Sequence, residues 1–174
     1  MKRYLANTDS LSYDKTFNLL YLIKNYLPIR KKTSLIRKEQ QEDKEFSNLF
    51  IWDINTKQKS KVFSDEIAQT EQVQKIIFEK DYNEKEQRIV FNIETQLLNY
   101  HNVPFRHPKN NLLIETYHRS SEKHHLWLCD KQGKGLQKIA SLSSNTQWHL
   151  DVGNHLIRMI THSKTDIDVQ EITW

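Results

Sequence analysis

Positively charged side chains gather in two short stretches between residues 30 and 61. Lys57, Lys59 and Lys61 alternate with other residues, so in a β-strand all three would project from one face. The other stretch would lie across a loop and the start of a helix, where free backbone N–H groups favour an anion. It contains Arg30, Lys31, Lys32, Arg37 and Lys38. Such cations can follow the phosphates of a nucleic acid, which makes these eight residues the candidate nucleic-acid-binding residues.

Aromatic residues lie near these cations in the sequence and can stack on bases where they are exposed. They are Tyr21, Tyr26, Phe50 and Trp52, of which Trp52 is expected to belong to the core. Lysine outnumbers arginine by 19 to 7, which favours contact with the backbone over base-specific recognition. The alternative interpretation is an ordinary solvated surface, because lysine-rich surfaces are common in proteins.

All eight histidines lie between residues 101 and 162. On alternating strands, His125 would share a face with Cys129, and His149 would share a face with Asp151. These groups can bind a metal if the two strands adjoin, but their spacing is not that of a known ligand set. We therefore expect no metal and no cofactor.

A second function class is a phosphodiesterase or nuclease. His118 followed by Ser120, and His162 followed by Ser163, suggest a base and an acid, with Lys164 or Arg158 holding a phosphate. A magnesium-dependent version would use Asp53 with Lys57, or Glu94 with Asp81. The two histidine patterns differ from each other, so no catalytic residue is assigned. A structural or protein-interaction module is the third class.

The sequence excludes several common enzyme classes. Its three glycines, Gly133, Gly135 and Gly153, are too few for a phosphate-binding loop or a dinucleotide-binding fingerprint. No Gly-x-Ser-x-Gly motif is present. Cys129 is the single cysteine, which rules out a disulfide framework or a paired-cysteine zinc site.

Composition indicates a folded protein with a charged surface. Aromatic residues make up 10% of the 174 residues, and the net charge is +4. No apolar run approaches the roughly 20 residues of a membrane span, so we expect cytoplasmic localisation and no membrane partner. A homodimer or higher homo-oligomer is expected from the general frequency of such assemblies. The abundance of Lys, Asn, Ile and Gln is typical of AT-rich bacterial genomes, including those of phages; no motif identifies a family.

Residues 1–103 are predicted to be mainly helical, in a single domain that spans 1–174. Helical spacing of apolar residues predicts helices over 11–27, from Ser34 to about 49, and over 64–80. Asn83 with Glu86 resembles a capping box that opens a fourth helix. Residues 50–63 can instead form a β-hairpin.

Residues 112–174 read as six short strands separated by turn residues. Their predicted ranges are 112–118, 124–130, 136–142, 147–152, 155–162 and 167–174. Together the two halves predict an α+β fold in which N-terminal helices pack on a C-terminal antiparallel meander of about five or six strands. The expected core residues are Tyr21, Ile77, Ile93, Leu113, Leu126, Leu128, Ile139, Leu150, Ile157 and Ile160.

Overall fold

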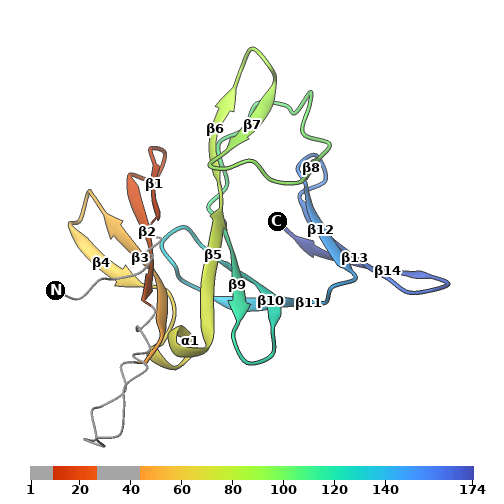
Figure 1. The fold of residues 1–174 in the computed structure, drawn as a ribbon. Helices are drawn as coiled ribbons and strands as arrows, with labels where there is room; N and C mark the ends of the chain where they lie inside the picture. The colour runs from red at the N-terminus through yellow and green to blue at the C-terminus, as the bar shows by residue number, and fades with distance from the viewer. Residues whose placement is uncertain (1–9, 27–43) are drawn as a thin grey trace, which may run out of the picture.

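The computed structural model describes residues 10–26 and 44–174, and within these ranges the fold is almost entirely β (Figure 1). The first sheet is an antiparallel meander whose strands follow the chain order. It consists of β1 (Ser10–Asp14), β2 (Leu19–Tyr26), β3 (Phe46–Asp53) and β4 (Gln58–Lys61). The short helix α1 (Asp65–Thr70) follows, and the Ser64 hydroxyl caps it by accepting a hydrogen bond from the Ile67 N–H.

Two further four-stranded sheets and a separate hairpin complete the described chain. The second sheet has the order β11 (Gln137–Leu142), β10 (Lys123–Cys129), β9 (Leu112–His118), β5 (Glu71–Ile77). The third has the order β14 (Ile167–Thr173), β13 (Leu156–His162), β12 (Thr146–Asp151), β8 (Leu97–Leu98), in which β8 is parallel to β12. The hairpin is β6 (Glu79–Asn83) with β7 (Arg88–Phe91).

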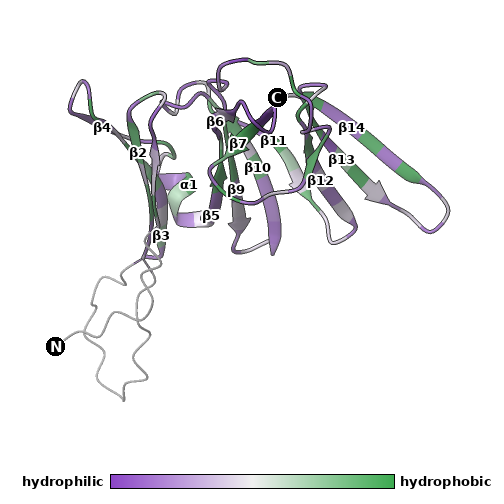
Figure 2. Cartoon of the chain, turned by 90° about the horizontal axis from the view of Figure 1, so that it is seen from above, coloured by the Kyte–Doolittle hydropathy of each residue, from purple (hydrophilic) through white to green (hydrophobic). Residues whose placement is uncertain are grey.

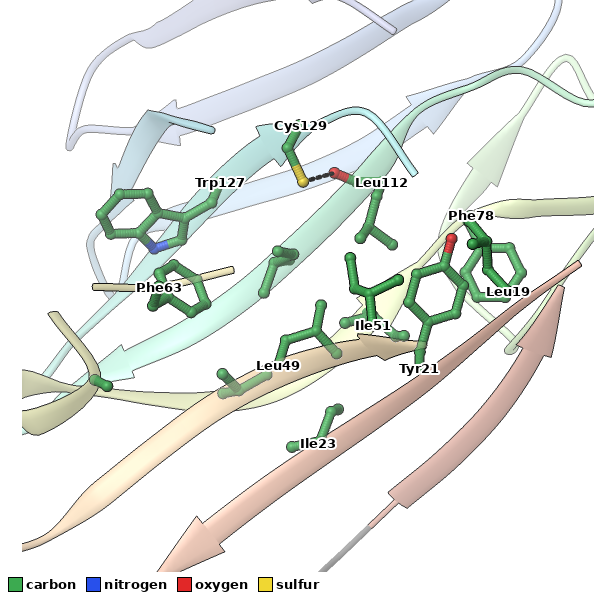
Figure 3. Close-up of a cluster of buried hydrophobic side chains, with 14 residues drawn as sticks. Leu19, Tyr21, Ile23, Leu49, Ile51, Phe63, Phe78, Leu112, Trp127 and Cys129 are labelled. Carbon is green, nitrogen blue, oxygen red and sulfur yellow. Dashed lines mark hydrogen bonds between the residues drawn. The ribbon is translucent and has the colours of Figure 1, made fainter. Parts of the chain in front are cut away.

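The second sheet lies between the other two, as the view from above shows (Figure 2). One of its faces packs on the first sheet, where Trp127 and Leu112 meet Leu49 and Tyr21 (Figure 3). Its other face packs on the third sheet, where Leu113 belongs to the same cluster as Trp148 and Leu150. A sheet that is covered on both faces needs apolar residues at consecutive positions, which explains the run of buried residues from Leu112 to Ile114.

Five hairpins share one loop geometry. Each has four loop residues, and the last of them adopts a positive φ: Asn18, Lys57, Gln87, Glu122 and His155. In each hairpin the residue before the loop accepts a backbone N–H hydrogen bond through its side chain. These acceptors are Asp14, Asp53, Asn83, His118 and Asp151. Short polar side chains favour such turns because they satisfy loop N–H groups locally.

The prediction of N-terminal helices packed on a meander is wrong. Residues 11–26 form β1 and β2, the predicted helix over 64–80 is α1 followed by β5, and the fourth predicted helix is replaced by β7 and β8. Asn83 does accept N–H bonds from Lys85 and Glu86, but these bonds close a hairpin loop. The start of the second predicted helix lies outside the described residues, and its end falls in β3.

The strand positions predicted for the second half and the hairpin predicted over 50–63 are confirmed. All six C-terminal strands form within about one residue of their predicted ranges, but they are divided between two sheets. β5 and β8 lie before residues 101–111 in the chain and pair with strands that follow these residues. Among the expected core residues, Ile93, Leu128, Ile139 and Ile160 are half-buried, and the other six are buried.

Candidate nucleic-acid interface

The first sheet has one face that no other described element covers. Its inward residues, including Tyr21 and Leu49, form the core with the second sheet. The alternate residues point the other way and form two rows across the four strands. One row is Leu11, Leu22, Phe50 and Lys61, and the other is Tyr13, Leu20, Trp52 and Lys59. We call these eight residues, together with Lys24 on β2, the outer face.

Large apolar side chains on the outer face are open to solvent. The exposed fraction is 68% for Leu11, 45% for Tyr13 and 40% for Trp52. Leu20, Leu22 and Phe50 are half-buried between them. A contiguous group of exposed aromatic and aliphatic residues is uncommon on a protein surface and marks an interaction site.

The charge of the outer face is positive. Lys24, Lys59 and Lys61 are exposed, and none of the outward residues of β1 to β4 is acidic. The Lys59 ammonium lies 5.9 Å from the centre of the Phe50 ring. Lys61 pairs with Asp65 at 2.6 Å, but both side chains are exposed, and such pairs contribute about 1 kcal/mol or less. Each row therefore runs from an apolar side chain on β1 to a cation on the edge strand β4.

The structure brings some of the sequence-predicted residues together. Lys59 and Lys61 lie on one face of β4, as alternation predicts, whereas Lys57 precedes the strand in the loop, with a φ of 58°. Trp52, predicted to be in the core, is exposed, and Tyr21 is fully buried and unable to stack. The residues Arg30, Lys31, Lys32, Arg37 and Lys38 lie outside the described part of the chain.

Sequence reasoning missed five residues of the outer face, which are Leu11, Tyr13, Leu20, Leu22 and Lys24. A signal for Leu11 and Tyr13 existed, because they are two residues apart and lie on one face of β1. A helical interpretation of residues 11–27 hides this alternation.

One histidine of the second sheet, His125, belongs to a buried polar network, whereas His118 is half-buried and His124 is exposed. The Nδ1 atom of His125 lies 2.7 Å from Glu71 Oε1, and Glu71 Oε2 accepts a hydrogen bond from Thr116 at 2.6 Å. The Trp127 N–H donates to the same threonine hydroxyl. The ring of His118 lies 5.3 Å from that of His125, but its Nδ1 accepts the Ser121 N–H as the loop aspartates do in other hairpins. His125 therefore connects β10 to β5, and His118 closes the loop between β9 and β10.

The geometry does not bring the proposed metal or phosphodiesterase groups together. His118 is on β9 of the second sheet, and His162 is on β13 of the third. Burial raises the pKa of Cys129 to about 12, which keeps it a thiol. Within residues 10–26 and 44–174, no group of three His, Cys, Asp or Glu side chains is placed to hold a metal ion.

Two of the carboxylates considered for a magnesium site, Asp53 and Asp81, have other partners. Asp53 accepts two loop N–H bonds, and Asp81 pairs with Lys15. Glu94 lines a groove of about 810 Å³ beside Glu115. Glu115 is already paired with Lys75 at 3.1 Å and with His124 at 3.0 Å.

In the described ranges, no helix is both long and apolar enough to cross a membrane. Comparison of the chain with protein-family models, with curated proteins and with solved structures gives no match.

Proposed function

We propose that this protein binds nucleic acid without acting on it chemically, and that it contacts phosphates with little sequence specificity. The observation that supports the proposal is the outer face, where exposed lysines border exposed aromatic side chains and none of the outward strand residues is acidic. A protein surface that combines cations with uncovered rings suits a polyanion that also carries flat bases.

The lysines of β4 supply the first contacts. Lys59 and Lys61 lie on the edge strand of the sheet. From this edge their ammonium groups can contact the phosphates of an extended nucleic-acid strand, and the protein needs no groove to hold that strand. A phosphate competes easily with Asp65 for Lys61, because the ion pair between these two residues is exposed. Lysine presents a compact charge on a flexible stem, which suits backbone contact more than base recognition. Arg30, Lys31, Lys32, Arg37 and Lys38, in the chain that joins β2 to β3, are proposed to add to this contact.

The side chains of the outer face suit binding more than catalysis. Its residues are aliphatic, aromatic or lysine, and none of them is a histidine or a carboxylate that would transfer protons near neutral pH. We therefore propose a binding function that depends on charge and on apolar contact.

Titration of labelled oligonucleotides at about 50 and 200 mM salt tests the proposal, because counterion release makes binding fall steeply over that range. The double variant Lys59→Ala/Lys61→Ala should bind more weakly and should reduce the slope of log K against log salt by about 1.5. The matched control is Lys123→Ala/Lys164→Ala, which removes one exposed lysine from β10 and one from the loop between β13 and β14. No binding at 50 mM, or equal losses in both double variants, would reject this function for the outer face.

A further inference from the structure

We infer that the outer face accepts single-stranded nucleic acid, with bases stacked on Trp52 and Tyr13 and phosphates along β4. This inference rests on the proposed function and adds the form of nucleic acid that is bound. The inference is argued from the order of side chains along each row. A lysine lies at one end of the row, and apolar side chains occupy the centre and the other end.

The row formed by Tyr13, Leu20, Trp52 and Lys59 shows how a single strand could fit the outer face. Lys59 on β4 is directly opposite Trp52 on β3, and neighbouring strands are about 5 Å apart. Leu20 on β2 separates Trp52 from Tyr13, which places the backbones of these two residues about 10 Å from each other across the sheet. A strand whose phosphates lie beside Lys59 can therefore direct its bases toward the two exposed rings.

A duplex does not offer the matching surface. Its bases are stacked on one another, and a protein reaches only their edges through the grooves. A ring such as that of Trp52 gains a stacking partner only from an unstacked base, as is found in single strands. The exposure of Trp52 and Tyr13 is thus explained by a single strand and left unexplained by a duplex.

Among the described residues, no element that could enter a groove lies on the outer face. A major groove about 12 Å wide admits a helix or a two-stranded ribbon. The short helix α1 is on the opposite side, where Ala68 belongs to the core cluster between the first and second sheets. The outer face consists of sheet side chains alone, as does the four-stranded surface that RNA-recognition motifs use for single strands.

Leucines complete the contact surface. Leu20 and Leu22 lie between the two ends of the rows, and Leu11 is the most exposed of them. Bases that stack on the aromatic rings would also cover these side chains, so that binding removes apolar area from water. Binding through phosphate contacts alone would not require apolar side chains beside the lysines.

Tryptophan fluorescence can follow binding at the outer face. Trp127, Trp148 and Trp174 have exposed fractions of 9% or less, so a stacking base reaches Trp52 preferentially. The probes are an oligodeoxythymidylate of about 12 nucleotides, within the usual site sizes, and a duplex of the same length at about 50 mM salt. We expect the single strand to quench the fluorescence and to bind more tightly than the duplex.

Substitutions then test the role of the ring. Trp52→Ala should weaken binding of the single strand by about 5- to 150-fold, the value of one base–aromatic stack, and should change duplex binding little. Trp52→Phe should retain most of the affinity, because it keeps a ring. Phe105→Ala, which removes a 64% exposed ring elsewhere, is the matched control and should bind as the wild type does.

The outcomes separate the two proposals. If the duplex binds as tightly as the single strand and Trp52→Ala leaves both unchanged, the single-strand inference is wrong and the proposed function remains. If neither probe binds at low salt, both are wrong. A third outcome is that neither probe binds, while size-exclusion chromatography shows an oligomer that Trp52→Ala converts to monomers. The outer face would then be a contact between copies of this chain.

Discussion

At the scale of single residues, the repeated hairpin loop shows how one side chain sets a backbone. Asp53 accepts the N–H groups of Asn55 and Thr56 at 2.9 and 3.1 Å, and Lys57 then adopts a φ of 58° to return the chain to β4. His118 takes the same position in the β9–β10 hairpin through its Nδ1 atom. Only the acceptor position is similar in sequence among these loops, so the shared geometry does not produce a visible sequence repeat.

Asp53→Ala should lower the free energy of unfolding by about 1–2 kcal/mol, because two loop N–H groups lose their acceptor. Urea denaturation of the variant against the wild type measures this change. Asp168→Ala removes an exposed carboxylate for which no hydrogen bond is found in the described structure, and it should change stability by less than about 0.5 kcal/mol. Equal effects of the two substitutions would contradict the role of the loop acceptor.

Gln87→Gly should raise the free energy of unfolding by up to about 1 kcal/mol. Gln87 has a φ of 46°, a conformation that is strained for any residue with a Cβ atom and free of that strain for glycine. Glu84→Gly, in the same loop but at a negative φ, should give no gain, because there glycine only adds freedom to the unfolded chain. Thermal melts of both variants provide the comparison.

At the scale of elements, the sequence pattern did not predict the N-terminal strands because both of their faces carry apolar residues. In β2, Leu19, Tyr21 and Ile23 point inward, while Leu20 and Leu22 belong to the outer face. Alternation between polar and apolar residues is then lost, and the spacing of the remaining apolar residues matches a helix. The same exposed leucines that obscured the strand make the outer face a candidate interface.

The second half was predictable because turn residues mark nearly every strand end. Gly133, Gly135 and Gly153 lie between strands, and polar clusters separate the others. What the sequence did not indicate is which strands share a sheet. That depends on β5 and β8, which join later strands across a long stretch of chain. For the candidate site, the alternation of Lys59 and Lys61 was readable, but the exposure of Trp52 depends on the layer order.

The position of the second sheet between the other two predicts a contrast in mutational cost. Leu113→Ala and Ile114→Ala remove side chains buried on opposite faces of β9, and each should lower the free energy of unfolding by about 2–5 kcal/mol. Leu22→Ala, on the outer face, should cost clearly less, because that side chain is only half-buried. Chemical denaturation measures all three. A small cost at either Leu113 or Ile114 would mean that one face of the second sheet is not packed.

At the scale of the whole molecule, the buried residue Glu79 connects distant parts of the chain. Its carboxylate accepts two hydrogen bonds from Arg106 at 2.6 and 2.8 Å, one from the Lys109 N–H and one from the Trp174 indole. Its carbonyl accepts a bond from the buried Lys131 ammonium, which forms an ion pair with Asp14 at 2.7 Å. One residue at the start of β6 thus joins the first sheet to the end of the third.

Because Glu79 is ionised in the folded protein, the free energy of unfolding should depend on pH in the acidic range. Burial alone would raise the pKa of this carboxyl, but hydrogen bonds from Arg106, Lys109 and Trp174 outweigh burial and lower it below the ordinary value. A lowered pKa in the folded state gives stability that is fully present above the unfolded pKa, near 4.3, and is lost as the pH falls through the folded pKa. The free energy of unfolding of the wild type should therefore fall steadily below about pH 5.

Glu79→Gln should cost about 3–5 kcal/mol at pH 7, because Arg106 is left without its charge partner, and should flatten the acid dependence of the unfolding free energy. Adding Arg106→Gln should cost less than the sum of the single losses, because the two side chains form one unit. Trp174→Phe is the milder comparison, since it removes one of the hydrogen bonds that lower the pKa of Glu79 and keeps the charge, so that most of the acid dependence should remain. Urea titrations between about pH 3 and 7 measure each variant. An unchanged acid slope in Glu79→Gln would show that this carboxylate does not link the parts of the fold through its charge.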